Sequence, residues 1–315
     1  MLTVAEVKAR TCKERDSWWT VLLVDPIAVR LTRLVAPLRW ITPNRVTLVA
    51  FALGLLAAAC FAQGSRGWLL AGAVLYHVSF LLDCIDGKIA RLNGTGSIFG
   101  VWLDYIFDHI RIIACAVALF AGLYAATDDV LYLMVGGGAL ILQLFHYVNS
   151  QEIFQINGEM RTRLADARTA AGLEPAVDAA EAAKRPGNRS IVELAGGGVG
   201  GGLFGRVRAW LRRSRIRPHL VGGIEFQMAM LVVAPLAGAV AGPGAVLAVI
   251  VTAAALMIFF ELAQIYLVYR AASSVTRQIA TIGGSTRNTD ALAFTAGFPA
   301  IHPRTSEEEV DRTRT

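Results

Sequence analysis

The chain has 315 residues, of which 55% are hydrophobic and only 17% are charged. This balance excludes an ordinary soluble domain and is typical of a protein with several membrane spans. The formal net charge is +6, and the four cysteines show no CxxC spacing, which argues against a disulfide framework or a zinc site.

The first predicted element is an amphipathic helix over residues 25–41. Asp25 is placed as its N-cap, and Pro26 falls in its first turn. One face of this helix is apolar, and the arginines lie off that face. The apolar face comprises Ile27, Leu31, Leu34 and Leu38. The pattern indicates a helix on a membrane surface, so residues 1–43 are predicted to be a cytoplasmic N-terminus with an interfacial helix.

Six apolar segments follow as candidate spans, since crossing a bilayer takes about 20 residues, and the fifth of them is short. They are placed at residues 44–64, 67–92, 97–126, 129–155, 224–241 and 243–272. The predicted fold class is therefore all-α, a polytopic membrane protein with six transmembrane helices. The first four helices form one predicted region, residues 44–157, and the last two form another, residues 223–274.

The remaining segments are polar. Residues 158–222 are predicted to be a basic cytoplasmic insertion, and residues 275–315 a polar cytoplasmic tail. The insertion contains the run GGGVGGGLFG at 196–205, which no predicted strand precedes. This context favours a flexible linker over a phosphate-binding loop. Helices are expected at 159–184 and, on the membrane surface, at 203–217.

Basic residues gather before the first span and in the insertion, whereas the links on the other side are short and carry Arg66 as their sole base. By the positive-inside rule, both ends of the chain are predicted to face the cytoplasm, with the spans in the cell membrane. The basic excess suits anionic lipid headgroups. Nucleic acid is not a predicted partner, because no binding motif or soluble domain accompanies the charge.

The segment LLDCIDGKIARLNGTGSIFGVWLDYIFDHIRI, residues 81–112, carries four aspartates within predicted spans. They are Asp83, Asp86, Asp104 and Asp108. Spacings of three and four residues place each pair on one helix face. At 1.5 Å per residue, Asp83 lies about 24 Å along the second span and Asp104 about 12 Å into the third. The four carboxylates are therefore expected to converge at a shallow depth on facing helices.

Each aspartate inside a membrane costs roughly 2.5–3.5 kcal/mol, so four unpaired ones approach the whole stability of a protein. Lys88 and Arg91 offer only two positive charges against four. Two divalent ions, Mg²⁺ or Mn²⁺, would offset the negative charge, and paired metal ions commonly serve phosphoryl transfer. The alternative is a cation or proton path, as in a transporter.

Two glycines flank the aspartates, since Gly87 follows Asp86 and Gly100 precedes Asp104 by four positions. Glycine in a membrane helix allows a ligand or another backbone to approach closely. Arg91, one turn beyond Gly87, is placed to meet a phosphate with its guanidinium fork.

The complete spacing, Asp-x2-Asp-Gly-x2-Ala-Arg-x8-Gly-x3-Asp-x3-Asp, resembles the motif of the CDP-alcohol phosphatidyltransferases, and every position is met. The motif residues are Asp83, Asp86, Gly87, Ala90, Arg91, Gly100, Asp104 and Asp108. The six-span layout and the sequence TPNRVT at 42–47 also resemble the family, whereas the insertion and the tail have no counterpart in it.

The resemblance implies that the four aspartates hold two divalent ions and that Asp108 is also the general base. It implies that the CDP group is bound by Asp83, Gly87, Ala90, Arg91 and Gly100. It further implies a site open to the cytoplasm, CDP-diacylglycerol as donor, an alcohol such as inositol phosphate or glycerol phosphate as acceptor, release of CMP, and a homodimer.

The acceptor pocket is less defined by the sequence. Its candidate residues are Arg111, Arg161, Arg163 and Arg217, because arginines can clamp a phosphorylated acceptor. The alternative is that these arginines face lipid headgroups. A second enzymatic hypothesis is transfer from a soluble CDP-alcohol to a lipid or polyol, and a cation transporter is a hypothesis of another class.

Overall fold

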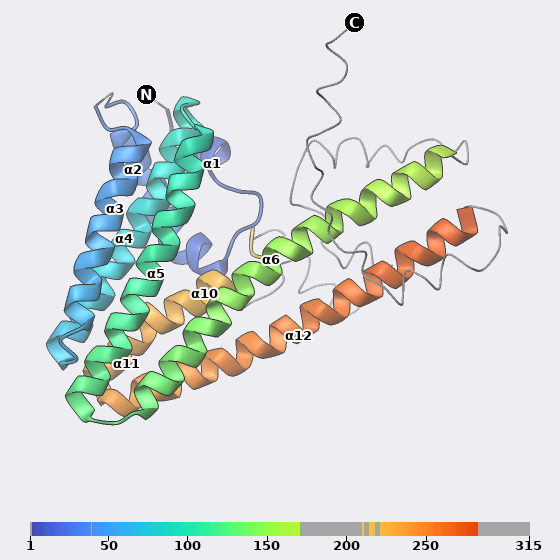
Figure 1. Ribbon diagram of the computed structural model, residues 1–315. Coiled ribbons are helices and arrows are strands. Elements are labelled where there is room, and N and C mark those ends of the chain that lie inside the picture. Colours follow the sequence, from blue (N-terminus) through green and yellow to red (C-terminus); the bar gives the residue numbers. More distant parts are fainter. Residues whose placement is uncertain (1, 39, 171–209, 211–213, 218–220, 283–315) are drawn as a thin grey trace, which may run out of the picture. The chain divides into compact units, whose positions relative to one another are not determined.

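The computed structural model describes residues 2–38, 40–170, 210, 214–217 and 221–282 (Figure 1). The chain divides into two compact units, residues 1–153 with 198–266, and residues 154–197 with 267–315. Within the described ranges every secondary-structure element is a helix. The only strand-like feature there is a single bridge between Asp16 and Ile216. The predicted glycine linker at 196–205 and the tail beyond 282 lie outside the described residues.

Helix α1 (Val4–Thr11) opens the first unit and was not expected from the sequence. Its first turn is a capping box, in which the Glu6 backbone N–H donates to the Thr3 side chain at 3.2 Å and the Thr3 backbone N–H donates to Glu6 at 2.7 Å. This reciprocal pair satisfies two N–H groups that a helix start leaves unpaired. The Thr-x-x-Glu spacing was the sequence signal for this helix.

Helix α2 (Asp25–Val35) follows a π-helical turn (Thr20–Val24). Asp25 is its first residue and Val24 its N-cap, one position before the prediction, and the helix ends at Val35 rather than 41, because Pro37 lacks the N–H group that would continue the hydrogen bonds. The predicted apolar face remains largely outside, with Ile27 47% and Leu34 69% exposed, while Ala28 and Val29 are buried. That arrangement leaves apolar side chains available to a membrane surface.

The six predicted spans are present as helices. They are α3 (Pro43–Phe61), α4 (Arg66–Asn93), α5 (Ile98–Thr127), α6 (Leu131–Ala170), a fifth span, and α12 (Pro243–Ile282). The fifth span comprises α10 (Gly223–Met228), a π-helical turn (Ala229–Val233) and α11 (Ala234–Ala241). All six are long and apolar enough to cross a membrane, which confirms the six-span prediction. Both α6 and α12 continue beyond their predicted ends at 155 and 272.

The turn between α4 and α5 determines where the aspartates meet. Helix α4 is closed by Gly94 in the left-handed conformation, at φ 64°. Helix α5 is capped by Ser97, whose hydroxyl oxygen accepts the Gly100 N–H at 2.9 Å. Glycine and serine supply the backbone freedom and the cap that such a turn needs. The chain therefore reverses within a few residues, and α5 returns packed against α3, which also packs against α4.

Helices α3, α4 and α5 pack side by side around the core of the first unit (Figure 1). Gly54 of α3 lies against the Arg111 side chain, because a Cβ atom there would lie 2.5 Å from Cγ of Arg111. The core side chains include Phe61, Tyr76, Ile112, Leu119 and Phe226, all at most 2% exposed. In the second unit a smaller apolar cluster comprises Met160, Ala271 and Val275.

Candidate active site

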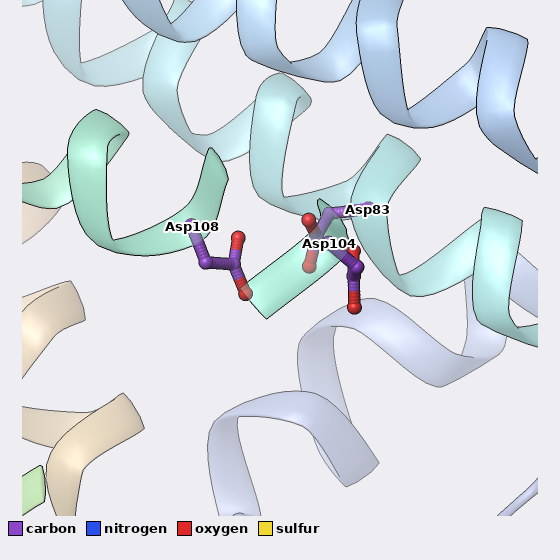
Figure 2. Close-up of side chains that lie close together, drawn as sticks. All are labelled: Asp83, Asp104 and Asp108. Carbon is purple, nitrogen blue, oxygen red and sulfur yellow. The ribbon is translucent and has the colours of Figure 1, made fainter. Parts of the chain in front are cut away.

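Three of the four predicted metal ligands lie together. Asp83 on α4 and Asp104 and Asp108 on α5 each offer one carboxylate oxygen, and these oxygens lie within 4.8 Å of one another (Figure 2). The i,i+4 spacing within α5 and the tight turn after α4 produce this arrangement. The expected convergence from the two helices is therefore present for these three carboxylates.

Asp86 has a separate partner. It is 4% exposed, and its Oδ2 accepts a hydrogen bond from the Thr47 hydroxyl at 2.6 Å. Thr47 belongs to the sequence TPNRVT at the start of α3, so this bond connects two segments that both resemble the family. The role of Asp86 as a metal ligand stays a prediction.

The chemistry of the cluster fits a divalent cation. Oδ1 of Asp104 is buried and has no hydrogen-bond partner among the described residues. A buried carboxylate oxygen without a donor is unfavourable, and a cation would satisfy it. Closely grouped carboxylate oxygens are the hard ligands that Mg²⁺ and Mn²⁺ prefer.

Arg111 supplies a positive charge that the sequence analysis did not count. It is 2% exposed, its Nη2 lies 3.3 Å from Oδ1 of Asp83, and the same nitrogen donates to Asp108. Its position three residues after Asp108 was the available signal, since residues at i,i+3 are neighbours on a helix. Because Arg111 binds both carboxylates, it neutralises part of their charge and fixes their orientation.

The two cations that the sequence analysis did count are used elsewhere. Lys88 pairs with Asp25 at 2.9 Å, and Asp25 also pairs with Arg215 at 3.1 Å. Burial opposes ionisation of Asp25, but the hydrogen bond and charge of Lys88 and the charge of Arg215 hold the pKa of that carboxyl below its usual value. Lys88 therefore does not offset the charge of the motif aspartates.

Arg91 is held by the N-terminal helix, since its Nε donates to the Thr11 carbonyl at 2.7 Å. Its Nη1 lies 3.4 Å from the point that a Cβ atom on Gly87 would occupy. The arginine thus extends along the helix face that carries Asp83, Gly87, Ala90 and itself, the face expected to meet the CDP group.

Gly100, the other predicted CDP contact, faces α3. A Cβ atom at this position would lie 3.0 Å from Oγ of Ser97 and 3.3 Å from Oδ1 of Asn44. Any larger residue would press on the cap of α5 and on the start of α3. CDP binding by these residues stays a prediction, and the glycine has a packing reason as well.

The four acceptor candidates lie in different surroundings. Arg111 is within the aspartate cluster, and Arg217 pairs with Asp16 at 3.7 Å. Arg161 and Arg163 belong to the second compact unit, where Arg163 forms an ion pair with Glu159. Acceptor binding by these four arginines stays a prediction.

A second polar cluster was not predicted. His146 on α6 pairs through Nδ1 with Glu261 on α12, and its Nε2 accepts the Gly223 N–H at 2.9 Å. The proton therefore resides on Nδ1, and the lone pair of Nε2 is already used. Although the Ser150 hydroxyl is 3.3 Å from Nε2, the histidine is not placed to act as its base. This cluster joins helices and explains why Glu261 lies within a span.

Comparisons with known proteins bear on this site. Residues 40–162 match the model of the family described as CDP-alcohol phosphatidyltransferase, a range that contains the whole motif. A phosphatidylinositol phosphate synthase from Corynebacterium glutamicum is 35% identical over 89 residues, 28% of this chain and 37% of the relative. An archaetidylinositol phosphate synthase from Pyrococcus horikoshii is 40% identical over 70 residues, 22% of this chain and 36% of the relative.

An inner membrane protein of Escherichia coli, YnjF, is 41% identical over 70 residues, 21% of this chain and 32% of the relative. The chain thus spans about a third of the length of these curated relatives, and 37% at most. The family match and the aspartate geometry concern the same stretch, helices α3 to α5 and the greater part of α6. Residues 40–162 are therefore similar to the CDP-alcohol phosphatidyltransferase domain, and the aspartate cluster lies within the matched stretch.

Proposed function

We propose that the protein transfers a phosphatidyl group from CDP-diacylglycerol to the hydroxyl group of an alcohol and releases CMP. The observation that carries the proposal is the cluster of Asp83, Asp104 and Asp108 within a motif whose every position is met. The acceptor proposed first is inositol phosphate, because two of the relatives are named as inositol phosphate lipid synthases. Glycerol phosphate is the second acceptor.

Divalent cations belong to this proposal. Asp83, Asp104 and Asp108 would hold them, and Asp86 would complete a set for two Mg²⁺ or Mn²⁺ ions. When bound, such ions neutralise the diphosphate and stabilise the attacking and leaving oxygens. The buried, unpartnered Oδ1 of Asp104 supports a cation here.

The other steps of the proposed reaction are assigned to individual residues. Asp108 takes the proton from the acceptor hydroxyl, whose oxygen forms a bond to the phosphorus distal to cytidine while the bond from that phosphorus to the CMP oxygen breaks. Arg111 keeps the Asp108 carboxylate oriented for this step. Arg91 binds the diphosphate through its guanidinium, and Gly87 leaves room for the nucleotide beside α4.

The setting of the reaction is proposed from the charge distribution. The site and both termini face the cytoplasm, and residues 158–222 and 275–315 extend from that side of the cell membrane. From the family resemblance, the proposed active form is a homodimer surrounded by membrane lipids.

The test is CMP release by the purified protein in lipid nanodiscs, with CDP-diacylglycerol, Mg²⁺ or Mn²⁺, and acceptors added one at a time. We expect CMP with inositol phosphate and none when the metal is chelated. CMP formed only from a soluble CDP-alcohol and a lipid acceptor would overturn the donor assignment. Metal flux into vesicles without CMP would indicate a transporter instead.

A further inference from the structure

Gln227 on α10 joins three helices inside the first unit. It is 3% exposed, its Nε2 donates to the Tyr76 hydroxyl of α4 at 2.6 Å, and its Oε1 accepts from the Tyr147 hydroxyl of α6 at 3.2 Å. Both ends of the amide are therefore paired, which fixes its orientation. A leucine at this position would deprive the buried Tyr76 hydroxyl of this hydrogen bond, so the amide holds the two tyrosines in place.

The Tyr76 end of this connection reaches Arg111. Tyr76 is fully buried, and its ring lies 5.9 Å from the Arg111 guanidinium carbon, within the range of a cation–π contact. Nη1 of Arg111 donates to the Ser79 hydroxyl at 3.1 Å, and Gly54 leaves space for the arginine stem. Arg111 is thus confined on several sides.

The Tyr147 end reaches α5 beside Asp108. The Tyr147 ring centroid lies 4.5 Å from that of His109, the residue after Asp108. His109 Nδ1 lies 2.7 Å from the backbone carbonyl oxygen of Tyr105, within hydrogen-bond distance. Gln227 is therefore connected, through one tyrosine each, to the arginine that binds the aspartate cluster and to the helix that carries two of its members.

We propose that Gln227 is a positioning residue of the active site, an inference that rests on the proposed function. Through Tyr76 it fixes Arg111, and through Tyr147 it fixes α5, so that Asp83 and Asp108 stay at the separation that cation binding and proton transfer require. Gln227 lies outside residues 40–162, so the matched domain depends on a side chain from α10.

The first test is Gln227→Leu in nanodiscs, with Gln264→Leu as the matched control. Gln264 lies on spanning helix α12, and its Nε2 has no hydrogen-bond partner among the described residues. We expect Gln227→Leu to lower kcat and Mn²⁺ affinity, measured by electron paramagnetic resonance titration, by about tenfold each, as loss of an outer partner commonly does. The KM for CDP-diacylglycerol stays within about twofold, since no donor contact is lost. Gln264→Leu leaves all three unchanged.

Tyr76→Phe is the second variant, because it removes only the hydroxyl that Gln227 meets and keeps the ring beneath Arg111. It is expected to act in the same direction but less, and the double variant to be no worse than Gln227→Leu, since both substitutions remove one connection. This arm remains informative if Gln227→Leu folds poorly, which size-exclusion chromatography reports.

Three outcomes decide the proposal. Unchanged Mn²⁺ affinity in Gln227→Leu overturns it, even if activity falls. Equal losses in Gln264→Leu overturn it as well, because they indicate general damage to the helices. Weaker Mn²⁺ binding in Gln227→Leu, in a protein whose wild type releases no CMP with any acceptor, supports the positioning role and removes the proposed function.

Discussion

Asp25 and the cluster of Asp83, Asp104 and Asp108 differ in how their negative charge is balanced. Asp25 has a partner for each oxygen, Lys88 at 2.9 Å and Arg215 at 3.1 Å. The aspartate cluster shares a single arginine, and Oδ1 of Asp104 has no hydrogen-bond partner within the described ranges. A buried carboxylate that the fold itself satisfies has a structural role, whereas crowded carboxylates left partly unsatisfied form a site that a cation would satisfy.

The largest effect on activity is expected for Asp108→Asn. The amide cannot accept the hydroxyl proton, so kcat should fall by about 10²–10⁴-fold. Folding is retained, and Mn²⁺ binding weakens without being lost, because Asp83 and Asp104 still offer carboxylate oxygens. CMP release and Mn²⁺ titration on the same sample measure both properties, and near-normal turnover would remove the assignment of the base.

Asp83→Asn should affect metal and rate together. This carboxylate belongs to the cluster and also pairs with Arg111. Its loss therefore removes an oxygen ligand and a partner of the arginine. We expect the Mg²⁺ concentration for half-maximal activity to rise, with a drop in rate of at least about tenfold. An unchanged metal titration curve would contradict a ligand role for Asp83.

Asp25→Asn tests the structural role of the Asp25 ion pairs. It leaves Lys88 buried without its counter-charge, which commonly destabilises a protein by about 3–5 kcal/mol. The melting temperature in nanodiscs should fall, while Mn²⁺ affinity per folded molecule stays the same. Should Mn²⁺ affinity fall as far as in Asp83→Asn, the two sites would not be separate.

The pH dependence of stability follows from the same pair. The pKa of Asp25 is lower in the folded protein than its ordinary value of 3.8. Its contribution is therefore fully present above that value and is lost as the pH falls through the lower folded pKa. Thermal melting between pH 7 and pH 2 should show a smaller acid-induced decrease in Asp25→Asn than in the wild type. An identical decrease in both proteins would mean that Asp25 does not contribute to it.

The smallest effect is expected from deletion of α1, residues 2–11. Arg91 then loses the Thr11 carbonyl, so the guanidinium is less ordered before the donor binds. The KM for CDP-diacylglycerol should rise about threefold with kcat unchanged, less than the full worth of a hydrogen bond to a charged group, because the guanidinium itself remains available to the diphosphate. A lower KM would show that Thr11 competes with the donor for Arg91.

The sequence by itself determined the six spans, because each apolar run is long enough to require the membrane. It also determined that Asp83 of α4 converges with Asp104 and Asp108 of α5, because the spacing of these residues and the turn closed by Gly94 are local properties. The end of α2 at Val35 was readable too, from Pro37, although the predicted helix ran to 41.

Tertiary structure alone decided which charges meet. Lys88 lies within the motif yet pairs with Asp25, and Asp86 bonds Thr47 rather than joining the other three aspartates. Gln227 reaches Tyr76 across 151 positions of sequence. Such partners depend on which helix faces pack together, a property of the whole assembly of helices. The apolar periodicity of one helix does not determine which of its faces packs against another helix, because a span surrounded by lipid and protein is apolar on most sides.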